Sequence, residues 1–250
     1  MTEIPTPARR YIDSDAKNVV LRLPRIGNLM IIGKRNGATH ERIGAVDGIV
    51  ENNGLLRCGG AAHDNSIDPA LIAEVVIDTS SVMGDKVYPR IDFNGRDGEP
   101  IFAVVGFGGL EPFEAALQGL SFVDDASIPA RPPRPERAPV SADDPALVPL
   151  YAALSSRLPI GITFEAEGFS QRWTGVVPKV NPSMGFINIM TDDFHLHLLG
   201  STVGGWVEER QGAGVVMRAL DSDGMPTGLM LSSETAKAFL PASTGSEASA

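Results

Sequence analysis

Two stretches with the same glycine spacing decide the fold: RNGATHERIG at residues 35–44 and AEGFSQRWTG at residues 166–175. A shift of 131 residues superposes three glycines of the first region on three of the second: Gly37, Gly44 and Gly54 on Gly168, Gly175 and Gly185. Glycine accepts bends and positive φ angles that other residues avoid, so repeated glycines indicate equivalent bends in equivalent strands. The spacing therefore predicts that the chain is an internal duplication.

A second match further along the chain supports this duplication. A shift of 126 residues superposes DGEP at residues 97–100 on DGMP at residues 223–226. A loop that is shorter by five residues in the second copy explains why the shift falls from 131 to 126. Asp-Gly pairs of this kind are typical of turns, so the two copies are expected to turn at equivalent places.

The composition limits the partners and the compartment. The 250 residues, 43% of them hydrophobic, suffice for one large core or two modest ones. The net charge of −10 opposes binding to nucleic acids and to anionic membranes, which attract clustered Lys and Arg. No segment approaches the roughly 20 apolar residues of a membrane span, and the N-terminus lacks an apolar signal region. The single cysteine, Cys58, excludes an internal disulfide, so we expect a cytoplasmic protein in which Cys58 is buried.

A proline-rich segment separates the two halves. Residues 121–145 contain six prolines, which bias the backbone toward extended polyproline geometry. We interpret this segment as a linker between two repeats, 15–120 and 146–240, in preference to a proline-rich ligand for another protein. Residues 241–250 are mostly small and polar, which predicts a disordered tail.

The local pattern on both sides of this segment is mostly strand. Six short segments are rich in β-branched or aromatic residues and are separated by turn residues: NLMIIGK, VYPRIDFN, IFAVVG, GITFEAE, GFINIM and VVMRALD. Helices are expected at residues 111–120 and 145–158, where apolar residues recur at helical spacing, with a short third one at 233–240. The predicted fold class is therefore α+β and dominated by sheets.

The same residues resemble a known family. GNLMIIGKRNGATHERIG at 27–44, with YPRIDFNGRDGEPIFAVVGFGGLEPFEAAL at 88–117, is similar to the first repeat of the bacterial haem-utilisation proteins of the HemS/HmuS/ChuX type. GFINIMTDDFHLHLLGSTVGGWVEERQGAGVVMRALDSDGMPTG at 185–228 is similar to their second repeat. The resemblance extends over residues 15–233 in the same order, with the proline-rich segment between the repeats.

This resemblance implies both a fold and a function. The implied fold has two tandem repeats, each with a large antiparallel sheet and flanking helices, and the two sheets are stacked. The implied function is haem binding or haem trafficking in the cytoplasm of bacteria that scavenge iron. Haem would lie in a cleft and pass to a haem-accepting protein, or be degraded there.

The residues that hold haem in the family are not matched in this chain. The family's iron-ligating His aligns with Val148, and an Arg that faces the haem aligns with Asn65. Of two later cations in the family, one remains as Arg210. Haem iron takes His, Cys, Met or Tyr as ligand, and the propionates favour Arg or Lys. The resemblance therefore implies altered iron ligation, and it identifies no site for haem degradation.

Four residues are candidates for binding haem: His63, Asn65, Tyr151 and Arg210. His63 lies two residues before Asn65, so on a strand both side chains leave from one face. Tyr151 lies three residues after Val148, near one helical turn, and a phenolate can bind ferric haem. The alternatives are structural: a hydrogen-bonded His, a core aromatic and a solvated Arg. The alternative function is that of a relative without haem, which binds another apolar ligand or a protein partner.

A competing constellation lies at Asp193-x-His195-x-His197. Strand alternation puts all three side chains on one face, and imidazole with carboxylate suits zinc or iron. A plain polar strand face is the simpler interpretation, and we assign no metal from the sequence. His40 matches a His of the family's first repeat and is interpreted as structural. Motifs for nucleotide binding, serine hydrolysis and zinc proteolysis are absent from the sequence.

Overall fold

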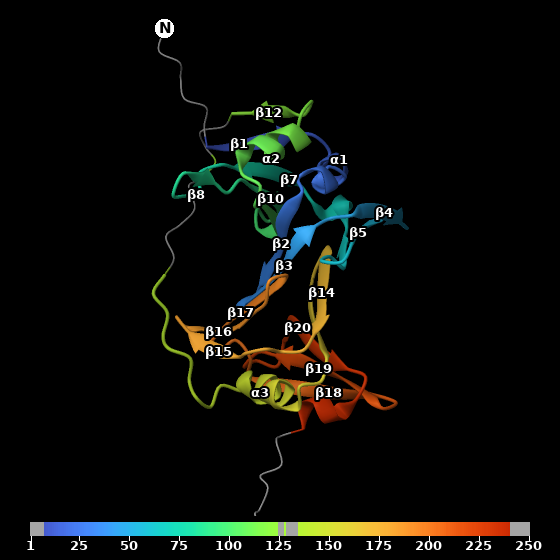
Figure 1. Cartoon of the computed structure of the whole chain (residues 1–250), viewed down its shortest axis with the longest axis vertical. Helices are drawn as coiled ribbons and strands as arrows, with labels where there is room; N and C mark the ends of the chain where they lie inside the picture. The colour runs from blue at the N-terminus through green and yellow to red at the C-terminus, as the bar shows by residue number, and fades with distance from the viewer. Residues whose placement is uncertain (1–7, 125–127, 129–134, 241–250) are drawn as a thin grey trace, which may run out of the picture.

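The protein consists of two large antiparallel sheets with short helices around them (Figure 1). The computed structural model describes residues 8–124, 128 and 135–240. One sheet has ten strands, the other has eight, and two further strands form a small separate ribbon. Among the described residues, no helix is long and apolar enough to cross a membrane. The predicted fold class, with its large antiparallel sheets, is confirmed.

The elements follow the chain in two series, in which η marks a 3-10 helix. The first half contains β1 (Arg9–Asp13), α1 (Ala16–Val20), η1 (Leu23–Arg25), β2 (Asn28–Arg35), β3 (Ala38–Ala45), β4 (Gly48–Asn52), β5 (Leu55–Gly59), β6 (Asn65–Ile67), η2 (Pro69–Leu71), β7 (Glu74–Asp78), β8 (Val82–Met83), β9 (Lys86–Val87), β10 (Arg90–Asn94), β11 (Pro100–Gly106), α2 (Leu110–Ala116) and β12 (Ser121–Val123). The second half contains α3 (Leu147–Ser156), β13 (Ile160–Ala166), β14 (Phe169–Gly175), β15 (Asn181–Ser183), β16 (Phe186–Met190), β17 (Phe194–Leu199), β18 (Gly205–Gln211), β19 (Gly214–Leu220), β20 (Pro226–Ser233) and η3 (Ala236–Phe239).

Each sheet is built from both halves of the chain. The ten-stranded sheet runs β12-β1-β7-β10-β11-β2-β3 and continues with β17-β16-β15 from the second half. The eight-stranded sheet runs β18-β19-β20-β13-β14 and continues with β6-β5-β4 from the first half. In Figure 1 the orange strands β17 and β16 continue the sheet from the blue strand β3, and the teal strands β4 and β5 lie near the upper end of β14. Each half therefore completes the sheet of the other.

Each half joins the sheet of the other at one strand pair, β3 with β17 and β6 with β14, and we call these two pairs the exchange points. The duplication relates their registers. Strand β17 places Leu196 opposite His40 of β3, and β6 places Asn65 opposite Gln171 of β14. The shift of 131 residues that aligns the glycines also aligns His40 with Gln171 and Asn65 with Leu196, so the two pairs are equivalent. The tandem-repeat relationship predicted from the sequence is therefore confirmed at the level of strand pairing.

The repeated glycines stand at equivalent turns. Three matched pairs have nearly identical positive φ angles: Gly37 and Gly168 (77° and 79°), Gly54 and Gly185 (81° and 79°), and Gly98 and Gly224 (78° and 78°). A side chain is strained in this left-handed region, which explains why both copies keep glycine there. The pair Gly44 and Gly175 differs, because Gly44 has φ 152° whereas Gly175 leaves space for the ring of Trp173.

Aromatic side chains join the two sheets. Phe93 of β10 stacks on Phe102 of β11 with ring centroids 4.2 Å apart, and Phe102 stacks on Phe169 of β14 at 5.2 Å. Further along, Trp173 of β14 stacks on Phe194 of β17 at 4.6 Å. These rings are buried, and offset aromatic pairs add to the stabilisation that burial provides. The face between the sheets is therefore a filled hydrophobic core.

A buried polar pair, His40 and Gln171, crosses this core. His40 Nε2 lies 3.1 Å from the carbonyl oxygen of Ile162, and Gln171 Nε2 donates to the carbonyl oxygen of Ile31 at 3.2 Å. The same shift of 131 residues relates these two contacts, and Gln171 Nε2 also lies 2.9 Å from His40 Nδ1. Burial lowers the pKa of His40 to about 3, so the imidazole is neutral at physiological pH. This environment agrees with the structural role expected for His40.

The helices are shorter than the sequence predicted. The expected helices at 111–120 and 145–158 are found as α2 and α3, and the third, at 233–240, is the 3-10 helix η3. Helix α1 was not predicted, because its five residues are too few to show a helical period. Three prolines of the predicted linker, at 129, 132 and 133, lie outside the described residues, as does the predicted tail at 241–250.

Candidate functional site

Helix α3 turns Tyr151 toward solvent. Val148, the position aligned with the family's iron-ligating His, is 72% exposed, and Tyr151 is 42% exposed one turn later. The opposite side of the helix, which includes Leu150 and Ala153, is buried in the core. Tyr151 is therefore not a core aromatic, and its phenol is accessible to a ligand.

The start of α3 is fixed by polar contacts around Asp144. Its Oδ1 accepts a hydrogen bond from the backbone N–H of Ala146 at 3.0 Å, and its Oδ2 accepts one from the N–H of Ser201 at 2.7 Å. The indole N–H of Trp206 donates to the carbonyl oxygen of Pro145 at 3.0 Å. These contacts tie the start of the helix to the loop before β18 and to β18 itself, and so set the direction in which Tyr151 points.

A cavity of about 400 Å³ opens at the C-terminal end of α3. Its walls include Leu154, Ser155 and the segment 176–178, and its one cation is the exposed Arg157. Leu154 and Ser155 follow Tyr151 by three and four residues, so the cavity borders the helix face that carries the phenol. The cavity thus combines apolar walls, a guanidinium group and a neighbouring tyrosine. Sequence reasoning missed Arg157, because the cavity depends on the loop after β14.

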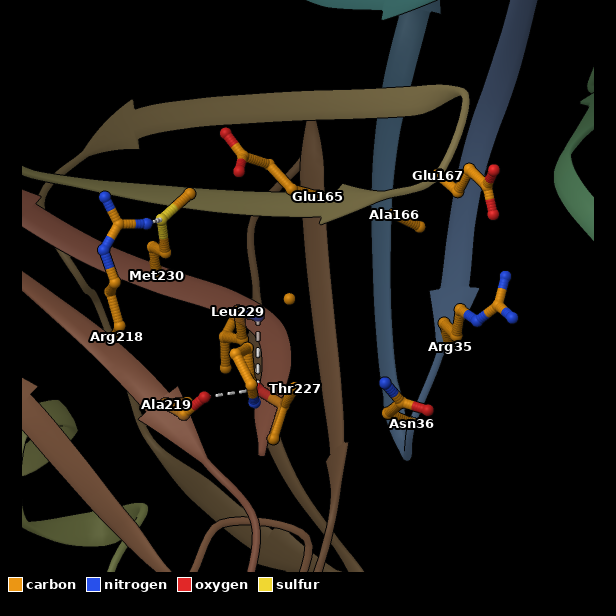
Figure 2. Close-up of a pocket in the computed structure, with 12 residues that line it drawn as sticks. Arg35, Asn36, Glu165, Ala166, Glu167, Arg218, Ala219, Thr227, Leu229 and Met230 are labelled. Carbon is orange, nitrogen blue, oxygen red and sulfur yellow. Dashed lines mark hydrogen bonds between the residues drawn. The ribbon is translucent and has the colours of Figure 1, made fainter. Parts of the chain in front are cut away.

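A second cavity, of about 480 Å³, lies beside the β2–β3 turn (Figure 2). Figure 2 shows Arg218 next to Met230 on one side, with Arg35 and Asn36 on the other. Two glutamates, Glu165 and Glu167, balance the two arginines, so no excess of one charge is available to select an ion. None of the four predicted haem-binding residues lines either of these two cavities.

His63 and Asn65 point into the protein. His63 is 3% exposed, its Nε2 lies 3.1 Å from the carbonyl oxygen of Gly44, and burial lowers its pKa. Asn65 is 4% exposed, and its amide donates to Gln171 Oε1. On β6 the two buried positions are Asn65 and Ile67, and Ser66 between them faces outward. The structure therefore places both His63 and Asn65 in the interior rather than on an open face.

Arg210 lies on the exposed surface of β18. Its Nε donates to Glu208 Oε1 at 2.8 Å, so its charge already has a carboxylate partner. Tyr151 and Arg210 are exposed, whereas His63 and Asn65 are buried. The four residues predicted to bind haem thus do not share one surface.

A separate polar cluster occupies the outer face of the ten-stranded sheet. His195 and His197 lie on β17, and Glu41 lies on the neighbouring strand β3. Glu41 Oε2 is 3.2 Å from His195 Nδ1 and 3.6 Å from His197 Nε2. One potential ligand atom from each residue lies within 4.8 Å of the others. Two imidazoles and one carboxylate therefore converge on one point of the surface.

The carboxylate of this cluster is not the one that the sequence suggested. Asp193 lies 3.3 Å from the guanidinium of Arg42 and accepts a hydrogen bond from Thr191 Oγ1 at 2.7 Å. Glu41 takes its place, although it is 154 residues away from His195 in the sequence. Alternation along one strand could not reveal this partner, because it comes from a strand of the other repeat.

The two imidazoles keep the carboxyl group of Glu41 ionised. Burial alone would raise the pKa of Glu41, but hydrogen bonds from His195 and His197, together with their charge, lower the pKa to about 2. His197 Nδ1 lies 2.6 Å from Asn188 Oδ1. The amide nitrogen of Asn188 donates to the carbonyl oxygens of Asn181 and Phe186, at 3.0 and 3.1 Å, which fixes which amide atom faces the imidazole.

Comparison with solved structures identifies proteins that share this fold. No protein-family model and no curated protein sequence matches the chain. Among solved structures, ChuS, a haem oxygenase of Escherichia coli, matches over 90% of this chain and 82% of its own, with TM-score 0.71 and 17% identity. Haem-bound PhuS, a haem-binding protein from Pseudomonas aeruginosa, matches over 90% of this chain and 81% of its own, with TM-score 0.71 and 15% identity. The fold that the HemS/HmuS/ChuX resemblance implied is confirmed.

Proposed function

We propose that this protein binds haem and carries it in bacterial haem-iron utilisation, with Tyr151 in place of the family's histidine ligand. The observation that carries the proposal is the fold, which matches ChuS and PhuS over 90% of the chain. ChuS is a haem oxygenase and PhuS a haem-binding protein. We expect the protein to act in the cytoplasm and to deliver haem to an acceptor protein.

The outer face of α3 is the place where we expect haem to lie. Tyr151 offers an exposed phenol to ferric iron, which is a known form of axial ligation. The neighbouring cavity has apolar walls at Leu154 and Val176 for the ring, and Arg157 offers a charge-assisted hydrogen bond to a propionate. His63 is a weaker candidate because it is buried and hydrogen-bonded, and Arg210 is already paired with Glu208.

Titration of the protein with hemin tests this proposal. The wild type should bind saturably, at one haem per chain, with a sharp Soret band. Tyr151→Phe removes only the phenol oxygen, so the Soret band should shift. The affinity for hemin should fall at least about tenfold, because one ligand contact to the iron is lost. Tyr88→Phe is the matched control, because Tyr88 packs edge-on against Phe107 far along the chain from α3. Saturable binding with the same spectrum in Tyr151→Phe would overturn the assignment of the ligand.

The alternative function is that of a relative that has lost haem and binds another apolar ligand or a protein partner. Two placements favour it: Val148 offers no ligand atom at the aligned helix position, and Asn65 points into the core. Under this alternative, hemin uptake would be nonsaturable and indifferent to Tyr151→Phe. Haem degradation would require that the Soret band disappear with a reductant present and that free iron be released.

A further inference from the structure

We propose that Glu41, His195 and His197 form a binding site for a divalent transition-metal ion of the zinc type. The site lies on the outer face of β3 and β17 in the ten-stranded sheet and does not involve α3. It is therefore independent of the haem proposal. Two imidazoles with one carboxylate are a ligand set that zinc and iron(II) accept, and zinc fits a tetrahedral arrangement with water in the fourth position.

Two of the three ligand-to-ligand distances match the edges of a metal-centred tetrahedron. Ligand atoms about 2.0–2.1 Å from a tetrahedral ion are separated from one another by about 3.4 Å. Glu41 Oε2 lies 3.2 Å from His195 Nδ1 and 3.6 Å from His197 Nε2. All three ligand atoms lie within 4.8 Å of one another, so rotation of the two imidazoles toward each other would close the third edge around an ion.

The strand register holds the three ligands in place. Glu41 and His195 are directly opposite each other on the antiparallel strands β3 and β17, and His197 is the diagonal neighbour on the same face. The backbone of the paired strands therefore fixes where all three side chains begin. A site built on paired strands keeps its geometry more precisely than one built on loops.

A neighbouring side chain orients one of the ligands. Asn188 of β16 lies opposite His197, and its Oδ1 is 2.6 Å from His197 Nδ1. Since an amide oxygen only accepts, His197 Nδ1 must carry a proton, and a metal ion that displaces the second proton would meet the Nε2 lone pair directed at the cluster. Metal-binding histidines are usually oriented by such a second hydrogen bond.

The duplication argues that the cluster is not a requirement of the fold. In the equivalent pairing of β6 with β14, the corresponding residues are Asp64, Ser66 and Arg172. These residues do not make a metal-binding set, yet the same strand exchange forms there. The two imidazoles and the carboxylate are therefore particular to one of the two exchange points, and the expected stoichiometry is one metal ion per chain.

Zinc titration of the full-length, tag-free protein tests the proposal. Competition with a chromogenic chelator should give one saturable site per chain. Glu41→Gln, His195→Ala and His197→Ala should each weaken binding at least about tenfold, and Asn188→Ala should weaken it about 10- to 100-fold, as outer-shell changes do. In addition, cobalt(II) should give the visible absorption of a tetrahedral site in the wild type and lose it in His197→Ala.

Asp193→Asn is the matched control, because Asp193 is the carboxylate nearest in sequence but faces Arg42. This variant should bind zinc as the wild type does. Absence of saturable binding, or equal binding by the wild type and His197→Ala, would overturn the proposal. Loss of binding in Asp193→Asn with retention in Glu41→Gln would overturn the assigned ligand set. Tyr151→Phe should leave zinc affinity unchanged, so this result does not depend on whether haem binds.

Discussion

His40 and Gln171 occupy equivalent positions in the two repeats, and their side chains meet between the sheets. Each contacts a backbone carbonyl oxygen of the opposite repeat, at Ile162 and Ile31 respectively. Such a buried polar network is stable only when its members stay paired, and a protonated imidazole could no longer accept from the amide of Gln171. The protonation of a single residue is therefore linked to the contact between the halves.

The stability of the protein should fall as the pH drops below 6.5, partly because of His40. In the unfolded state His40 takes up a proton near the ordinary histidine value of 6.5, whereas in the folded state its pKa is about 3, so acid favours unfolding throughout this interval. One such group contributes at most about 1.4 kcal/mol per pH unit. His40→Gln, which copies the other repeat, should therefore lose less stability than the wild type between pH 6.5 and 4.5.

Urea unfolding at several pH values in the presence of a chelator measures this difference. Burial also lowers the pKa of His63, so part of the acid sensitivity should remain in His40→Gln. Parallel stability curves for the two proteins would show that His40 is not the group responsible.

Individual residues were predictable where local chemistry decides their role. The turn glycines were identified by their spacing, and the burial of Cys58 follows from its type and is confirmed. Burial also raises the pKa of the Cys58 thiol to about 12. The role of Glu41 was not predictable, because its partners belong to a strand 154 residues away. Sequence alternation identifies a face of a strand but not the strand that lies beside it.

Helix α3 carries the candidate haem site on one side and packs against the core with the other. Its inner side packs Leu150, which is fully buried, while Val148 and Tyr151 face outward. Helical spacing in the sequence grouped Tyr151 with the apolar residues of this helix. The structure turns Tyr151 outward because only one side of this helix of ten residues contacts the core.

Two substitutions in α3 test which side of the helix packs against the core. Leu150→Ala leaves a cavity in the core and should lower the free energy of unfolding by about 2–5 kcal/mol. Val148→Ala removes methyl groups from a side chain that is 72% exposed, so the change should stay within about 0.5 kcal/mol. Urea denaturation followed by circular dichroism measures both. Equal effects of the two changes would mean that α3 is not packed in the orientation described.

The whole molecule depends on strand exchange. The ten-stranded sheet is built mainly from the first half of the chain and the eight-stranded sheet mainly from the second, and each half adds three strands to the sheet of the other. Each hydrophobic face is therefore completed by strands from the other half of the same chain. The local pattern predicted the strands, and the resemblance predicted two stacked sheets. The exchange itself is not visible in any local pattern, because β3–β17 and β14–β6 pair residues more than 100 positions apart.

Cutting the linker should leave the halves together. We expect that a protein with a specific protease site inserted between residues 128 and 135 will, after cleavage, elute as one species in size-exclusion chromatography. It should also unfold in a single urea transition, because neither sheet is complete in one fragment. Two fragments that separate without denaturant, or that unfold at different urea concentrations, would support two independent domains along the boundaries 15–120 and 146–240.

The meeting of His40 with Gln171 has an evolutionary consequence. In an assembly of two identical polypeptides, residues that face each other across a twofold axis must be the same, so every substitution at the axis is made twice. Joining both copies in one gene removes that constraint, and here it permits an imidazole on one side and an amide on the other. A fused duplication can thus tune a central contact one partner at a time.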